Sequence, residues 1–156
     1  MTRERLIGLA GLGSALILLT GFGFQYLGGL APCELCLWQR WPHAIAPVLA
    51  LLAVFTGGRL MPLAGMLTMF GSCGLGIYHT GVERHWWPGP SSCTGDAGGL
   101  QAMSGADLLN FDATVPVVLC DQVAWQMFGL SMASYNALAS VVLAGLWLRA
   151  VLLTRR

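Results

Sequence analysis

The chain contains no lysine, and only 10% of its 156 residues are charged. A soluble domain carries roughly 25% charged residues, so this composition excludes an ordinary water-facing surface. The formal net charge is +1, which argues against a nucleic-acid partner because such surfaces are strongly basic. Hydrophobic residues make up 56% of the chain, and the mean hydropathy is +0.68. The composition therefore indicates a protein embedded in a lipid bilayer.

Charged residues are also missing from four long stretches of the sequence. These stretches cover positions 6–33, 41–58, 60–82 and 122–148. Each is close to or longer than the ~20 residues that an α-helix needs to cross the hydrocarbon core. The stretches lack the alternation of barrel strands, and backbone groups in lipid must be hydrogen-bonded within the chain. We therefore predict an all-α, polytopic membrane protein.

The predicted architecture is a bundle of four transmembrane helices in a single domain that comprises residues 1–156. The helices are expected at about 6–27, 35–57, 60–82 and 130–151. Two connecting loops are expected at one end of the bundle, at about 28–34 and 83–128. They contain Cys33, Cys93 and Cys120, and Cys36 follows at the start of the second helix. Within the longer loop, a short amphipathic helix is expected at 100–109.

Arginines are distributed unevenly between the two ends of this bundle. Six lie at the end that holds both termini and the 57–59 turn, whereas the opposite end has only Arg40 and Arg84. Because cytoplasmic loops are enriched in positive charge, we expect both termini in the cytoplasm. The two cysteine-containing loops then lie outside the cytoplasm, where disulfides form and persist.

Cys33 and Cys36 form a C-x-x-C motif at the start of the second expected helix. This spacing is typical of a redox-active dithiol. The main alternative is half of a zinc site, which normally needs a second closely spaced pair, whereas Cys93 and Cys120 are far apart in the sequence. We therefore expect no metal. The motif also lacks the following histidine of a c-type haem site, because Leu37 stands at that position.

Cys93 and Cys120 belong to the same acidic outer loop. One interpretation is a structural disulfide that stabilises a loop with little hydrophobic core. The other is a second redox pair, because thiolate attack passes oxidation between pairs through mixed disulfides. A C-x-x-C motif on the same face of the membrane favours the relay. Cys73, among glycines of the third expected helix, is expected to be a packing residue.

Cys36, Arg40 and His43 are spaced so that they share one face of the second helix. A sulfur near the helix N-terminus is stabilised as a thiolate by the helix dipole. Arg40 either anchors the helix at the membrane interface or stabilises a thiolate and the oxygens of a reduced lipid-soluble acceptor. An acceptor that takes two electrons and resides in the bilayer points to a quinone.

The histidines allow two further interpretations. His43 and His79, on neighbouring helices, would suit a haem b carrier. His79 and Glu83, one turn apart, would instead suit a proton pathway to a quinone. A third possibility for the chain as a whole is a disulfide-stapled membrane scaffold without redox turnover.

Several motifs together resemble the bacterial disulfide bond formation protein B (DsbB) family. They are Cys33-Glu-Leu-Cys36-Leu-Trp-Gln-Arg40, Tyr78-His79-x-Gly81-Val82-Glu83, Trp87-Pro88-Gly89-Pro90-Ser-Ser-Cys93, Cys120-Asp-Gln-Val-Ala-Trp125 and Phe128-Gly129-Leu130-Ser131-Met132. The likeness covers nearly the whole chain. Cys73 lies outside the family's pattern.

The resemblance implies an enzyme of the bacterial inner membrane that reoxidises a periplasmic DsbA-like, thioredoxin-fold protein. In the implied relay, the reduced partner attacks Cys93 of a Cys93–Cys120 disulfide. Freed Cys120 then attacks Cys33, which releases Cys36 as a thiolate. DsbA is itself strongly oxidising, so only a more oxidising acceptor, such as a quinone, favours this direction.

The resemblance also implies the cofactor site. Cys36 faces a bound ubiquinone or menaquinone, and Arg40 stabilises both the sulfur and the quinone. His79 and Glu83 are assigned to the same quinone-binding region.

Overall fold

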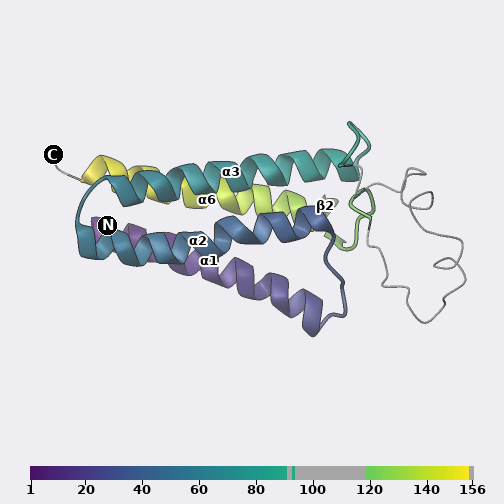
Figure 1. Cartoon of the computed structure of the whole chain (residues 1–156), viewed down its shortest axis with the longest axis horizontal. Coiled ribbons are helices and arrows are strands. Elements are labelled where there is room, and N and C mark those ends of the chain that lie inside the picture. Colours follow the sequence, from purple (N-terminus) through teal and green to yellow (C-terminus); the bar gives the residue numbers. More distant parts are fainter. Residues whose placement is uncertain (91–92, 94–118, 155–156) are drawn as a thin grey trace, which may run out of the picture.

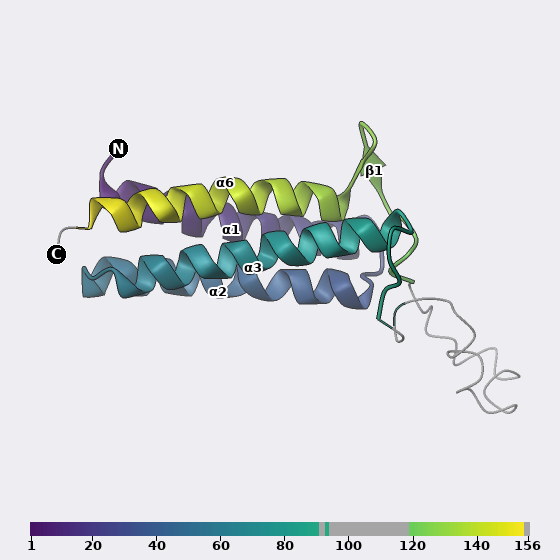
Figure 2. The ribbon, with the colours of Figure 1, turned by 90° about the horizontal axis from the view of Figure 1, so that it is seen from above.

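The computed structural model describes residues 1–90, 93 and 119–154, which form a bundle of long helices with a short β-hairpin (Figure 1). The elements are α1 (Arg3–Tyr26), α2 (Glu34–Thr56), α3 (Leu60–Glu83), β1 (Gln126–Met127), β2 (Leu130–Ser131) and α6 (Met132–Leu153). Successive helices run in opposite directions. Both termini and the 57–59 turn therefore lie at one end, and the hairpin lies at the other (Figure 2).

The predicted all-α class is confirmed for the described part of the chain, apart from the hairpin. The helices that are long and apolar enough to cross a membrane are α1, α3 and α6. Helix α2 is of similar length, at 23 residues, but it carries Gln39, Arg40 and His43 in its first half. These polar residues lower the mean hydropathy of α2.

Large apolar side chains cover the outside of the bundle. On α1, Leu12, Leu16 and Leu19 are 66%, 63% and 63% exposed. Helix α6 similarly exposes Val142 and Leu152. Helices that are apolar on all sides belong in the core of a large protein or in a membrane. The exposed leucines therefore agree with a surface that faces lipid.

Small residues allow the helices to approach closely inside the bundle. The core in the half that contains the termini consists of Leu6, Ile7, Ala10, Ala46, Ala50, Ala53, Met69, Leu143, Ala144, Trp147 and Ala150. A Cβ atom added at Gly11 would lie 2.6 Å from the Cβ of Ala50. Without a hydrophobic driving force between helices, this close packing is what holds membrane helices together.

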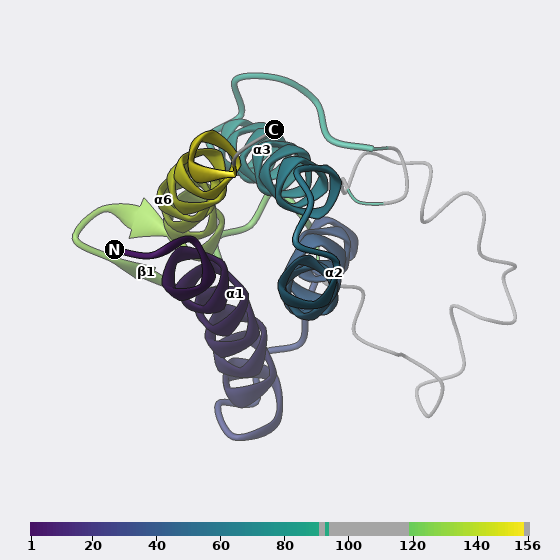
Figure 3. The same ribbon diagram turned by 90° about the vertical axis from the view of Figure 1, so that its left-hand side faces the viewer.

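Each helix packs against two neighbours: α1 contacts α2 and α6, and α3 contacts the same two helices. Figure 3, seen from the end that holds the termini, shows the resulting ring and the inclination of α1 away from the others. Figure 1 shows the same divergence between α1 and α2 toward the hairpin end. The bundle is therefore tight near the termini and wider near the cysteines.

The hairpin was not expected, and it displaces the start of the last helix from the predicted position 130 to Met132. Phe128 and Gly129 form its turn with positive φ angles of 51° and 76°, as a tight two-residue hairpin turn requires. Ser131 then caps α6 by accepting a hydrogen bond from the Ser134 amide. The amphipathic helix expected at 100–109 lies outside the described residues.

Substitution of Gly65 by alanine is expected to destabilise the bundle. A Cβ atom at Gly65 would lie 2.5 Å from the indole of Trp147, which is fully buried. Overpacking of this kind costs about 1–3 kcal/mol. Gly74→Ala, in the same helix, is the matched control because a Cβ atom there meets nothing within 4 Å. Thermal unfolding of both variants in detergent would measure the difference, and equal midpoints would contradict the packing argument.

Candidate functional site

Cys33 is placed by the start of α2, where its sulfur caps the helix. The Cys33 Sγ accepts a hydrogen bond from the backbone N–H of Cys36 at 3.2 Å. The Cys33 thiol also donates to the Cys36 Sγ across 2.8 Å. Both residues are free thiols; Cys33 is buried and Cys36 is partly exposed. The C-x-x-C motif therefore forms a closely spaced dithiol around the first turn of a helix.

Hydrogen bonding within this dithiol distinguishes its two sulfurs. The hydrogen bond to Cys36, together with burial, raises the pKa of the Cys33 thiol. Cys33 therefore keeps its proton. Cys36 lies inside the first turn of the helix, where the N-terminal dipole favours the thiolate. The sequence prediction that Cys36 is the thiolate of the pair agrees with this arrangement, although the helix starts at Glu34 and the capping sulfur is that of Cys33.

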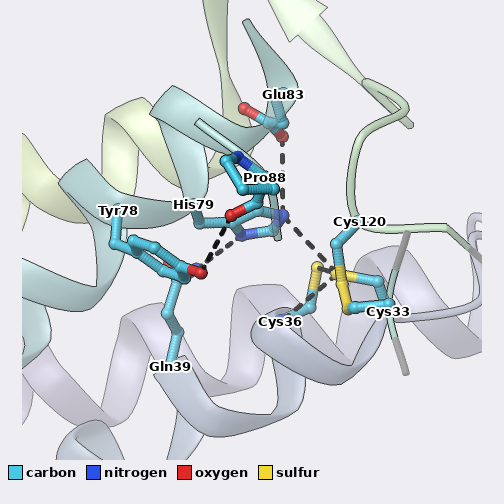
Figure 4. The surroundings of a disulfide bond; sticks show 9 residues. Cys33, Cys36, Gln39, Tyr78, His79, Glu83, Pro88 and Cys120 are labelled. Atoms are coloured by element: carbon cyan, nitrogen blue, oxygen red, sulfur yellow. Dashed lines mark hydrogen bonds and ion pairs between the residues drawn. A yellow bond between two sulfur atoms is a disulfide. The ribbon is translucent and has the colours of Figure 1, made fainter. Parts of the chain in front are cut away.

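A disulfide joins Cys93 and Cys120, with their Cα atoms 5.1 Å apart. The Cys120 amide donates a hydrogen bond of 2.7 Å to the Cys93 carbonyl oxygen. Both residues are buried in one apolar cluster with Cys33, Leu35 and Val82, and Cys36 packs against it. Figure 4 shows the disulfide beside the sulfurs of the dithiol. Two cysteine pairs that are distant in sequence thus meet at the end of the bundle.

His79 connects the dithiol with helix α3. Its Nε2 lies 3.5 Å from the Cys33 Sγ and 3.9 Å from Glu83 Oε1. Its Nδ1 lies 2.7 Å from the Nε2 of the buried Gln39. Because an amide nitrogen donates, Nδ1 accepts and the neutral ring carries its hydrogen on Nε2. The ring therefore presents an N–H group to Cys33, with Glu83 behind it (Figure 4).

Arg40 is held by α1 and does not contact the sulfurs directly. Its guanidinium donates to Gln25 Oε1 at 2.6 Å and to the Gly21 carbonyl oxygen at 3.4 Å. The same group lies 4.9 Å from the centre of the Phe22 ring. These contacts satisfy part of the desolvated charge. Arg40 is therefore fixed inside the bundle rather than directed freely toward the interface.

A cavity of about 400 Å³ opens between the helices next to the dithiol. This size is within the range of small-molecule sites. It is lined by Ile17, Leu18, Thr20, Gly21, Phe24, Ala31, Cys33, Cys36, Gln39, Arg40, His43, His79, Glu83, Leu119, Gln122, Ala124, Trp125, Met127, Met132, Ala133, Tyr135, Asn136 and Ala139. Trp125 packs against Phe24 and Tyr135, with ring centres 5.3 Å and 6.0 Å away. The lining is thus largely apolar, and its charged and histidine side chains belong to α2 and α3.

The structure places the residues predicted from the sequence in two adjoining groups. Cys33, Cys36, Arg40, His79 and Glu83 line the cavity. Cys93 and Cys120 lie beside Cys33 in the apolar cluster and are not among the lining residues.

Three polar residues that touch the predicted ones were missed. Gln39 binds His79, Gln25 binds Arg40, and Asn136 binds His43. Each lies in or beside a long uncharged stretch, where a polar side chain is costly unless it is paired. This cost indicates that each of the three residues has a hydrogen-bond partner. The sequence does not reveal which residue that partner is.

The haem interpretation conflicts with the contacts of His79. Both of its ring nitrogens have partners, Gln39 on one side and Cys33 with Glu83 on the other. Neither nitrogen is therefore free to ligate iron without loss of these contacts.

A metal interpretation has some geometric support, although no metal was expected. The sulfurs of Cys33 and Cys36 and a ring nitrogen of His79 lie within 4.8 Å of one another, and they form a soft donor set. A structural zinc site takes four ligands, and this group provides three. The contact between this dithiol and a disulfide is better suited to exchange of electrons than to a closed metal site.

Fold and site together define a class: a helical membrane protein in which a dithiol, a disulfide and an apolar cavity meet. The family model described as "Disulfide bond formation protein DsbB" matches residues 3–150. The chain belongs to the DsbB family of membrane disulfide-forming oxidoreductases.

Proteins called disulfide bond formation protein B are among its relatives. The one from Dechloromonas aromatica is 30% identical over 149 residues, covering 92% of this chain and 87% of that protein. The one from Polaromonas sp. is 26% identical over 160 residues, covering 97% and 91%. The one from Albidiferax ferrireducens is 27% identical over 142 residues, covering 85% and 78%. No solved structure matches the chain.

Alkylation of the reduced dithiol is expected to be selective for Cys36. The pKa of Cys33 is raised above its usual value and its side chain is only 4% exposed. Labelling of Cys33 by iodoacetamide should therefore stay low between about pH 7 and 9, a range in which an ordinary thiol with a pKa of about 8.5 ionises. Mass spectrometry of peptides would give the ratio, with buried Cys73 as the internal reference. Faster labelling of Cys33 would reverse the assignment.

Proposed function

We propose that the chain reoxidises a periplasmic DsbA-like, thioredoxin-fold protein and passes the electrons to ubiquinone or menaquinone in the bacterial inner membrane. The observation that carries this proposal is the double position of Cys36. Cys36 belongs to the dithiol that packs against the Cys93–Cys120 disulfide, and it also lines the apolar cavity. One residue thus connects a thiol-exchange centre with a space suited to a lipid-soluble molecule.

The proposal includes all four helices as membrane spans, with both termini in the cytoplasm. Helix α2 then crosses as the fourth span, with its polar residues turned toward the cavity. Gln39, Arg40 and His43 all line that cavity, so they need not face lipid. The disulfide packs against Cys33 and Leu35 at the start of α2. This end of the bundle lies opposite to the termini (Figure 1) and becomes the periplasmic end.

Transfer from the partner proceeds by thiol–disulfide exchange. A partner thiolate attacks Cys93, which forms a mixed disulfide and releases Cys120 as a thiolate. Cys120 attacks Cys33 of a Cys33–Cys36 disulfide and releases Cys36. The partner's second thiol then closes its own disulfide and releases Cys93.

Cys93 finally attacks Cys120, which restores their disulfide and releases Cys33. These steps leave Cys33 and Cys36 as a dithiol and Cys93 joined to Cys120. His79 supports the last step because its Nε2–H faces Cys33 and can stabilise the departing sulfur. Glu83 lies beside that nitrogen and extends the path for protons.

Residues of the cavity fit a quinone headgroup. When bound, a quinone accepts two electrons and two protons and leaves as quinol, while Cys33 and Cys36 close to a disulfide. Arg40 has five N–H donors, and in the described part of the chain they contact only two oxygen atoms. Donors therefore remain for a quinone oxygen. The apolar lining from Ile17, Leu18 and Phe24 excludes water and suits the ring and its tail.

A trapping experiment tests the exchange pathway. Cys120→Ser, expressed with a periplasmic partner that lacks its resolving cysteine, should accumulate a mixed disulfide at Cys93. The Cys33–Cys36 disulfide is the oxidant for this bond and is reduced to the dithiol as the bond forms. Neither Cys120 nor a second partner thiol is then present to resolve the adduct. Peptide mapping would locate the adduct. The double variant Cys93→Ser/Cys120→Ser is the control and should give none.

An adduct found mainly on Cys33 would contradict the proposed order. No adduct in Cys120→Ser, together with resistance of both cysteine pairs of the unsubstituted chain to mild reductant, would instead favour the structural scaffold. Because the partner is periplasmic, formation of the adduct also tests the proposed sidedness of the loop.

Replacement of Arg40 tests the quinone site separately. Loss of a charge-assisted hydrogen bond costs about 1.5–3 kcal/mol, so Arg40→Met should raise the apparent KM for quinone about ten- to a hundredfold. Exchange with the partner at Cys93 should stay largely intact. Arg84→Met is the matched control, because Arg84 is the other arginine at this end and does not line the cavity. Steady-state quinone titration with unchanged kinetics in Arg40→Met would remove Arg40 from the quinone site.

A further inference from the structure

A second group of polar side chains lies deeper in the bundle than the dithiol. We call this group, which consists of His43, Ser72, Asn136 and Ser140, the inner polar cluster. His43 Nε2 lies 2.8 Å from Asn136 Oδ1 and 3.3 Å from the Ser72 Oγ. Ser72 accepts hydrogen bonds from Asn136 Nδ2 at 3.4 Å and from the Ser140 Oγ at 2.9 Å. The cluster connects α2, α3 and α6 at one level.

His43 has one polar atom that this network leaves unsatisfied. The side chain is 1% exposed, and its Nδ1 is buried with no hydrogen-bond partner among the described residues. Buried polar atoms almost always have a partner, so an exception calls for an explanation. An ionisable residue inside a membrane helix is also a candidate functional residue by default. The missing partner of Nδ1 is therefore a sign of a ligand.

Asn136 determines what kind of partner Nδ1 can take. Because Asn136 Oδ1 only accepts hydrogen bonds, the His43 Nε2 that faces it must carry the hydrogen. Asn136 Nδ2, which donates to Ser72, supports this orientation of the amide. In the neutral ring, Nδ1 is then an acceptor. His43 Nδ1 consequently has a lone pair rather than an N–H group.

The same cavity connects His43 with the dithiol. His43 and Asn136 line it together with Cys36 and Arg40. His43 follows Cys36 by seven positions on the same helix face, which corresponds to about 10 Å along the axis at ~1.5 Å per residue. A ring with oxygen atoms on opposite sides can therefore present one oxygen to Cys36 and Arg40 and the other to His43.

We propose that the inner polar cluster binds the reduced form of the lipid-soluble acceptor, with His43 Nδ1 accepting a hydrogen bond from the quinol hydroxyl that points away from Cys36. This inference rests on the proposed quinone reductase function and specifies how its site distinguishes quinol from quinone. A quinone carbonyl oxygen only accepts hydrogen bonds, whereas a quinol hydroxyl also donates. The acceptor at Nδ1 therefore favours quinol, and Arg40 serves the oxygen atom of either form.

Preferential binding of quinol would make reduction at the site more favourable. If quinol binds tenfold more tightly than quinone, the potential of the bound two-electron couple rises by about 30 mV. Electron transfer from the cysteines would then be favoured at the cavity, and dissociation of quinol would be correspondingly slower. His43 is thus a ligand-binding residue that shifts the equilibrium between the two bound forms.

The test compares the affinities of decylubiquinone and decylubiquinol for the full-length protein in anaerobic nanodiscs. All proteins carry Cys36→Ser, so that no electrons pass between sulfur and ligand during the titration. Quenching of tryptophan fluorescence reports binding, because Trp125 lines the cavity. Without the His43 substitution, quinol should bind about tenfold more tightly than quinone, as expected for one hydrogen bond to a buried acceptor. His43→Phe should remove this preference and change the quinone affinity less than about twofold.

Two further variants guard against effects of folding. Asn136→Leu keeps His43 but removes the group that fixes its hydrogen on Nε2, so the preference for quinol should fall. Ser14→Ala is the matched control, because Ser14 is a buried polar residue that bonds to Met69 and does not line the cavity. It should keep the preference. If His43→Phe does not fold, Asn136→Leu decides the question.

The possible results separate this inference from the proposed function. Equal loss of quinone and quinol affinity in His43→Phe and Asn136→Leu would reduce His43 to a part of the cavity wall and overturn the inference. An unchanged preference for quinol would overturn it as well. If the parent protein binds neither ligand, quinone reduction itself is wrong. A measured fall of about 30 mV in the potential of the bound couple in His43→Phe would support the inference independently of activity.

Discussion

Lipid offers no hydrogen-bond partner to a buried polar group. This constraint determines how the reactive side chains of the molecule are positioned. Several reactive side chains in the described part of the bundle are fixed by another part of the chain. Cys33 caps the helix that carries Cys36, Gln39 orients His79, and Gln25 holds Arg40. In water, such groups would be solvated independently. Within the bundle, each contact also fixes the orientation or the protonation state of the side chain that makes it.

Cys33 combines several of these contacts in one atom. Its sulfur accepts from the Cys36 amide, donates to the Cys36 sulfur and faces the N–H of His79. It also belongs to the buried cluster that contains the Cys93–Cys120 disulfide. In the proposed exchange, the residue that ends a loop and starts a helix is therefore the one through which both cysteine pairs communicate.

Much of this organisation was predictable from the sequence, because lipid imposes simple rules. Uncharged stretches and the C-x-x-C spacing gave the four helices and the position of the dithiol, and the motifs indicated the family. The partners of Arg40 and His43 were not predictable, since a lone Gln25 or Asn136 in an apolar stretch shows only that some partner exists. The hairpin was missed because Phe128 is an unusual residue for a position with positive φ.

The antiparallel order of the helices divides the chain into two helical hairpins joined at the 57–59 turn. The first hairpin, α1 and α2, contains Cys33 and Cys36, and the second, α3 and α6, is connected by the segment that contains Cys93 and Cys120. Neither half has both redox couples, and the cavity takes lining residues from each. Docking of the two halves therefore brings the two cysteine pairs together and completes the cavity. Under the proposed function, a chain whose halves have not docked has no route for electrons from the disulfide to the quinone.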